Sequence, residues 1–79
     1  MGKGKPWDAG RVLALRQGLE LTQTELGNRL GVALRTVQHW EGGDRTPRGA
    51  AGRLLDTLEG ELSARRSRLA RAAERTEGR

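Results

Sequence analysis

Four neighbouring side chains near the middle of the chain carry the groups that recognise the edges of DNA base pairs: Leu34, Arg35, Gln38 and His39. Arg35 can donate two parallel hydrogen bonds to guanine O6 and N7, and Gln38 can pair with adenine. His39 can donate or accept a hydrogen bond, and Leu34 can pack on a thymine methyl group. These four residues are therefore our candidates for base reading, although Leu34 and His39 have a plain alternative as ordinary exposed helix residues.

A helix over residues 34–41 is the element that must present these side chains. Val37 and Trp40 lie three apart, so they share one side of such a helix and leave the opposite side to the base-reading candidates. Because Trp40 shares a helix face with Val37, we predict that it belongs to the core and does not stack on bases. Gly42-Gly43 should end the helix.

A second helix precedes this one at the distance of a tight turn. Thr22 and Glu25 form a capping box, and Leu26 and Leu30 lie four apart on one helix face. Gly31 then stands where the chain needs a left-handed residue to leave the helix. Two helices joined in this way are a helix-turn-helix, which places its second helix in a groove of DNA.

Further helices are expected on both sides of this unit. Trp7-Asp8 looks like a helix start, with Asp8 as the cap, and this helix should end near Gly18. Thr46-Pro47 should open another helix, with the proline at its first position. The apolar positions that would face the core are Val12, Leu15, Leu19, Leu54, Leu55 and Leu58. We expect an all-α fold of four to five helices.

The composition excludes several functions. The chain has no cysteine and one histidine, so a thiolate or histidine-cluster metal site is not expected. It has no glycine-rich phosphate loop, no nucleophile and base around His39 and no carboxylate cluster, so we expect neither an enzyme nor a cofactor. No apolar run resembles a signal peptide or a membrane span, which predicts a cytoplasmic protein without a membrane partner. A formal net charge of +5 favours a polyanion partner.

The chain divides into three expected parts: a flexible basic lead at 1–5, a helix-turn-helix domain at 6–60 and a basic helix or tail at 61–79. The last part is rich in alanine and arginine, which favours helix but offers few large apolar groups. It is either a frayed, solvated tail or part of a short dimer seam. The seam would use Leu55, Leu58, Leu62, Leu69 and Ala72, with Arg65 interrupting it.

Residues 10–58 resemble the helix-turn-helix domain of the Xre/Cro family, which includes the lambda-type phage repressors. The resemblance rests on segments that agree in order and spacing: Thr22-Gln23, Glu25-Leu26, Leu30-Gly31-Val32, Arg35-Thr36-Val37, Trp40-Glu41 and Pro47. Two positions depart from the family pattern. Gly27 stands where alanine is common, and Ala33 stands where serine or threonine often caps the recognition helix.

The resemblance also implies roles for individual residues. It makes Gln23 a phosphate contact, and it pairs Arg16 with Glu41 in a structural ion pair. Further candidates for phosphate contacts are Thr22, Thr36, Arg45 and Arg48.

These observations favour a DNA-binding transcription regulator. The resemblance implies a homodimer that represses its own operon by placing residues 34–41 in an inverted-repeat site on double-stranded DNA, where the protein would be associated with the nucleoid. One alternative is an antitoxin that also binds a toxin protein, and another is a phage autorepressor associated with anti-CRISPR genes. A basic membrane-surface helix at residues 61–76 is disfavoured because large apolar residues are scarce there.

Overall fold

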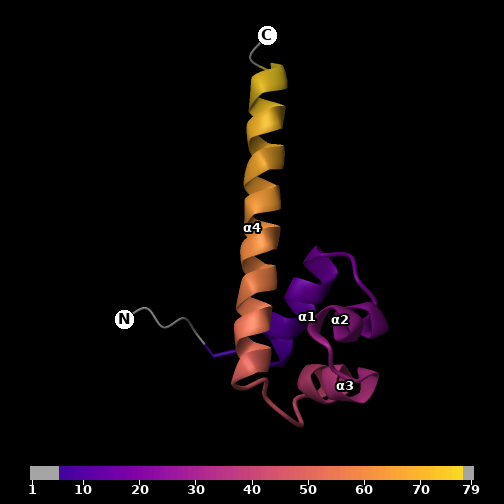
Figure 1. Cartoon of the computed structure of the whole chain (residues 1–79). Helices are drawn as coiled ribbons and strands as arrows, with labels where there is room; N and C mark the ends of the chain where they lie inside the picture. Colours follow the sequence, from indigo (N-terminus) through magenta and orange to yellow (C-terminus); the bar gives the residue numbers. More distant parts are fainter. Residues whose placement is uncertain (1–5, 78–79) are drawn as a thin grey trace.

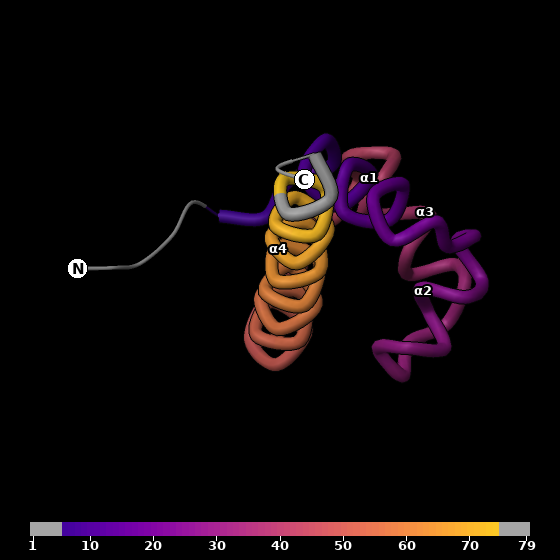
Figure 2. The backbone as a smooth tube through the Cα atoms, turned by 90° about the horizontal axis from the view of Figure 1, so that it is seen from above, coloured from indigo at the N-terminus to yellow at the C-terminus, as the bar shows by residue number. Residues whose placement is uncertain are grey.

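The computed structural model describes residues 6–77, with side chains to Glu74, and the lead expected at 1–5 lies outside this range. The described residues form four helices: α1 (Ala9–Gly18), α2 (Gln23–Leu30), α3 (Leu34–Gly42) and α4 (Ala50–Glu77). Helices α1, α2 and α3 lie together on one side of α4 (Figures 1 and 2). The expected all-α fold is confirmed.

The local signals at the helix ends act as predicted. The Asp8 side chain caps α1 by accepting a hydrogen bond from the Arg11 amide at 2.8 Å. Thr22 and Glu25 exchange both bonds of the capping box, at 3.0 and 2.8 Å. Gly31 ends α2 with φ 75°, a left-handed conformation that only glycine adopts at little cost. These caps fix where α1 begins and where α2, the first helix of the helix-turn-helix, begins and ends.

All four helices meet at one point in the core. Each contributes one side chain with no exposed surface: Val12 from α1, Leu26 from α2, Val37 from α3 and Leu55 from α4. Burying such a side chain stabilises the fold by about 1.5 to 3 kcal/mol. The helix-turn-helix is therefore held from behind by α1 and by the first half of α4.

The start of α4 differs from our prediction. The helix begins at Ala50, three residues after Pro47, which is buried before the helix starts. Gly49 has φ 56°, and this left-handed residue cannot belong to a right-handed helix. The prediction that Leu54 is buried was also wrong, since 43% of this residue is exposed. Starting the helix at Ala50 puts Leu55, Leu58 and Leu62 on the inner face.

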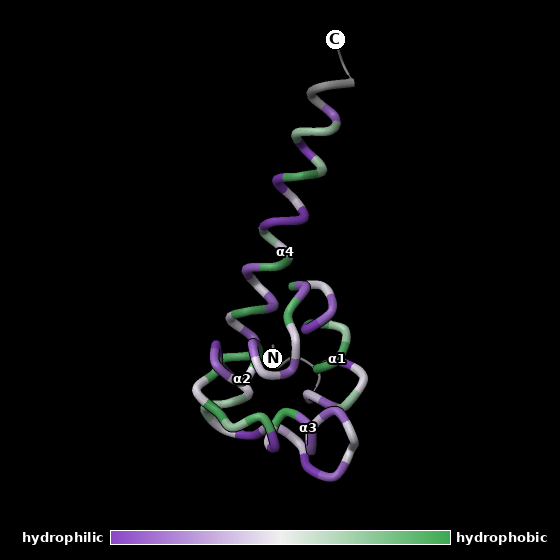
Figure 3. Tube along the Cα trace, turned by 90° about the vertical axis from the view of Figure 1, so that its right-hand side faces the viewer, coloured by the Kyte–Doolittle hydropathy of each residue, from purple (hydrophilic) through white to green (hydrophobic). Residues whose placement is uncertain are grey.

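Helix α4 runs without interruption through the boundary expected between residues 60 and 61. We call residues 63–77 the arm; its end projects beyond the other helices (Figure 1), and every described arm side chain is exposed. The coiled-coil seam cannot form as expected, because Leu55, Leu58 and Leu62 are already buried against the chain's own helices. Hydrophilic residues dominate the arm (Figure 3). None of the helices in residues 6–77 has the length and hydropathy needed to cross a membrane.

Candidate nucleic-acid interface

Helix α3 has a buried side and an open side. Val37 and Trp40 are 0% and 4% exposed. On the other side Arg35 and Gln38 are exposed, and Leu34 is 41% exposed. Helix α3 lies at the end of the molecule opposite the end of the arm (Figure 1). Leu34, Arg35 and Gln38 are therefore open to solvent.

An open groove with a volume of about 840 Å³ runs from α3 into the loop that follows it. The residues that line it are Arg35, Thr36, His39, Trp40, Asp44, Arg45, Thr46 and Arg48. The structure thus brings two of the base-reading candidates, Arg35 and His39, together with three of the residues expected to contact phosphates. Leu34 and Gln38 are not part of this lining. Thr22 and Gln23 belong to the start of α2.

Asp44 is a groove residue that sequence reasoning missed. Its carboxylate lies 3.3 Å from Nδ1 of His39. Gly43, with φ 84°, turns the chain so that the Asp44 amide donates to the His39 carbonyl at 2.9 Å. This glycine turn was the available signal, because a residue just after a left-handed cap folds back over the last helical turn. The carboxylate is within hydrogen-bond distance of the His39 ring, and it lies in a groove with three arginines.

Arg16 and Glu41, the pair expected to be structural, join α1 to the end of α3. The guanidinium donates to both carboxylate oxygens, at 2.6 and 3.0 Å. It also donates to the Leu21 carbonyl at 3.0 Å. The Arg16 and Glu41 side chains are only 18% and 9% exposed, so water screens the pair weakly.

Gln23 completes this network, because its side-chain nitrogen donates to Glu41 at 3.0 Å. Burial raises the pKa of Glu41, but the hydrogen bonds from Arg16 and Gln23 and the charge of Arg16 outweigh it, so the pKa lies below its ordinary value. The Glu41 hydrogen bond raises the pKa of Arg16. The network sets the position of Gln23, our phosphate candidate at the start of α2, relative to α3.

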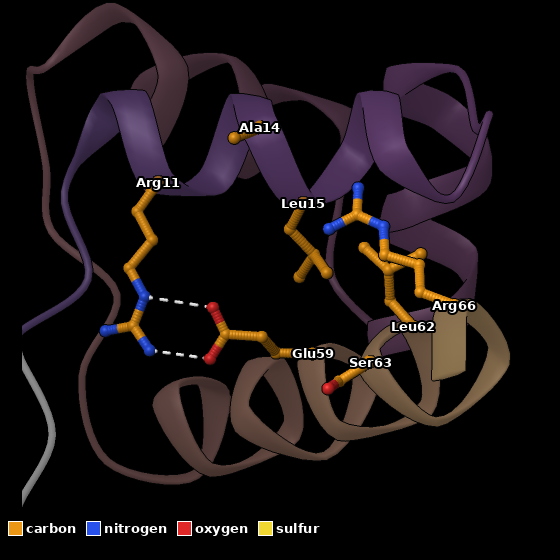
Figure 4. Close-up of a pocket in the computed structure, with 7 residues that line it drawn as sticks. All are labelled: Arg11, Ala14, Leu15, Glu59, Leu62, Ser63 and Arg66. Carbon is orange, nitrogen blue, oxygen red and sulfur yellow. Dashed lines mark hydrogen bonds and ion pairs between the residues drawn. The ribbon is translucent and has the colours of Figure 1, made fainter. Parts of the chain in front are cut away.

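A second polar cluster, which sequence reasoning missed, anchors α1 to α4. Arg11 donates to the two carboxylate oxygens of Glu59 at 2.7 and 3.3 Å (Figure 4). Its guanidinium also lies 3.8 Å from the centre of a Trp7 ring, and the Trp7 indole donates to Asp56 at 2.8 Å. The hydrogen bond to Glu59 raises the pKa of Arg11. No sequence signal linked these residues, because they lie about 48 positions apart.

The pocket beside this cluster lies between α1 and α4, and Leu15 and Leu62 line it (Figure 4). All of its lining residues belong to α1 and α4, and none belongs to α3. Within residues 6–77, no group of three or more histidine or acidic side chains is arranged to hold a metal ion.

Comparison with known proteins agrees with this geometry. A family model described as helix-turn-helix matches residues 12–55, which is more than half of the chain. Neither the curated proteins nor the solved structures contain a significant match. The matched range begins in α1, contains all of α2 and α3, and ends at the fully buried Leu55. The chain belongs to the Xre/lambda-repressor-like helix-turn-helix family of DNA-binding transcription regulators.

Proposed function

We propose that the protein is a dimeric repressor of its own operon that reads an inverted repeat with α3. The observation that carries this proposal is the open side of α3, where Leu34, Arg35 and Gln38 are exposed opposite the buried Val37 and Trp40. A helix with this division can enter the major groove while its other side stays in the core. Arg35 is the main base reader because its two donors match guanine O6 and N7.

The groove beside α3 supports the proposed backbone contacts. Arg45 and Arg48 line it with Thr36, so cations and a hydroxyl lie next to the helix that would enter the DNA. Thr22 and Gln23 add polar groups at the start of α2, where the helix dipole favours a phosphate. With about four phosphates neutralised per subunit, the log affinity of a dimer should fall with log salt at a slope of about −7.

The shape of the chain supports a particular dimer. Because α3 and the end of the arm lie at opposite ends (Figure 1), a two-fold axis that sets both copies of α3 on one DNA face runs roughly along α4. Leu54 is the exposed leucine of the first half of α4, and it is our candidate for the contact between copies. The two half-sites should lie about 34 Å apart, one helical turn of DNA.

The test is a DNA-binding titration of the wild type and of Arg35→Ala. Each protein is titrated with the chain's own promoter region and with a random duplex of equal length, at two salt concentrations. We expect the wild type to prefer the promoter and Arg35→Ala to lose about 1 to 3 kcal/mol of that preference. Arg66→Ala is the matched control, because Arg66 is an exposed arginine remote from α3, and it should keep the preference. Equal, weak binding of the wild type to both duplexes would refute sequence reading.

A further inference from the structure

The charges of α4 are sorted along its length. The acids of its first half, Asp56, Glu59 and Glu61, are each bound to a side chain of α1, α2 or the segment before α1. From residue 62 to residue 73 the helix carries arginines and no acid. The arm therefore projects from the domain as a positively charged rod.

One arginine of the arm, Arg66, contacts the domain. Arg66 lies so close to the carboxyl end of α1 that a Cβ on Gly18 would come within 3.0 Å of its guanidinium. A cation at the carboxyl end of a helix is favourable because the helix dipole is negative there. The role of Arg66 is thus accounted for within the domain.

Three further arginines of the arm lie along one side of the helix. Arg65, Arg68 and Arg71 follow one another at intervals of three residues, which is about 4.5 Å along the axis. All three are exposed, and none is paired with a carboxylate among the described residues. We call these three residues the arginine stripe.

The surroundings of the stripe favour a polyanion over a protein partner. Leu69, the only large apolar side chain described in the arm, lies seven residues after Leu62 and continues the line of leucines that faces the domain. The stripe itself consists of cations, whereas protein interfaces are centred on apolar anchors, and its like charges oppose a second copy of the same stripe. Phosphate contacts require only the cations.

We propose that the arginine stripe binds the phosphate backbone of a second DNA duplex without reading its sequence. The stripe begins beside the domain, where Arg65 and Arg68 line a shallow pocket with Leu19 and Arg29, and it continues along α4 away from α3. The longest dimension of the molecule is 50 Å. One chain can then hold two duplexes, one at each end, and join separate DNA segments. This activity is additional to the proposed repression and does not depend on the operator.

The first experiment isolates the stripe. R35Q/R45Q/R48Q removes the arginines of the α3 groove, and fluorescence anisotropy then measures its binding to a short random duplex. We expect retained binding whose log affinity falls with log salt at a slope of about −3, one unit for each stripe arginine. Adding R65Q/R68Q/R71Q should abolish this binding, whereas adding R66Q should leave it almost unchanged. Glutamine is nearly as good a helix former as arginine, and circular dichroism checks that helicity is kept.

The second experiment measures joining directly. Protein bound to an immobilised duplex is offered a fluorescent second duplex, and the captured fluorescence is recorded. The R65Q/R68Q/R71Q variant should still bind the immobilised duplex through the α3 groove but capture about tenfold less of the second duplex than wild type or R66Q does.

Three results would overturn the proposal. The first is an R35Q/R45Q/R48Q variant that no longer binds the random duplex. The second is an R65Q/R68Q/R71Q variant that captures as much second duplex as R66Q, which would locate that contact elsewhere. The third is a preference of R35Q/R45Q/R48Q for single-stranded RNA of the same length, which would reassign the stripe to RNA. A failure of promoter recognition would not change the anisotropy measurements on R35Q/R45Q/R48Q, which lacks the groove arginines, so the two proposals can be judged separately.

Discussion

The two halves of α4 form one continuous helix but are ordered by different interactions. The first half buries Leu55, Leu58 and Leu62 in the core. The described part of the arm buries no side chain, and most of its charges have one sign. Isolated helices of this length are marginal in water, so the arm depends on extension of the anchored half. The first half of α4 therefore supports the domain that carries α3, whereas the arm leaves its side chains exposed.

Removing one leucine from each half tests this contrast most directly. Leu55→Ala should lower the free energy of unfolding by about 3 kcal/mol, because the site is fully buried in the core. Leu69→Ala should cost less than about 0.5 kcal/mol, because 61% of Leu69 is exposed. Urea unfolding followed by circular dichroism measures both values. Equal losses would mean that the arm is packed in solution.

Ion pairs provide a second comparison between buried and exposed parts of the molecule. Among the ion-paired carboxylates of the described residues, Glu41 is the most buried. Replacing it by glutamine leaves Arg16 without its ion-pair partner and should cost about 2 kcal/mol near pH 7. Because the pKa of Glu41 is lowered in the folded state, its contribution is present above pH 4.5, the ordinary value, and is lost as the pH falls through the folded-state pKa.

The stability difference between wild type and Glu41→Gln should therefore shrink below about pH 4.5. Urea unfolding at neutral and acidic pH measures it. Arg68→Gln is the control from the arm, and its effect should be near zero at both pH values. A difference for Glu41→Gln that is the same at both pH values would contradict a role for the Glu41 charge.

The features of the helix-turn-helix that could be predicted from the sequence are those determined by residues close together in the chain. Thr22 and Glu25 cap each other, Gly31 ends its own helix, and Val37 and Trp40 fix the phase of α3. Each of these signals acts within one or two helical turns. The exposure of Arg35 and Gln38 followed from that phase, while their contacts with bases remain predictions.

What could not be predicted depends on residues distant in the sequence or on backbone geometry between helices. Arg11 meets Glu59 only after α4 has folded back along α1. The left-handed Gly49 delays the start of α4, and Leu62 is buried although the six residues after it are small or polar. Asp44 enters the groove through the turn at Gly43. Local patterns do not contain this tertiary information.

Replacing an arginine that pairs with the first half of α4 should lower stability more than replacing an arginine of the arm, although the effect is smaller than that of Glu41→Gln. Arg11→Gln removes the two hydrogen bonds from Arg11 to Glu59 on the first half, and should cost about 1 kcal/mol because both groups remain partly exposed. Thermal unfolding measures this loss. The matched change in the arm, Arg68→Gln, should leave the midpoint temperature within experimental error. A clear loss for Arg68→Gln would reveal a partner for that side chain.

The smallest expected difference is in the free energy of local opening at two amides of α4, which amide hydrogen exchange measures. The amide of Leu58 should open only with global unfolding, because its side chain is buried in the core. The amide of Ala70 should open at a cost of about 1 kcal/mol or less, because only helix propagation holds it. Protection should therefore decline steadily after Leu62. If Ala70 were as protected as Leu58, another molecule would have to cover the arm, and a concentration dependence of that protection would identify it as a second copy. Protection that appears only when a random duplex is added would instead support DNA as the occupant of the arginine stripe.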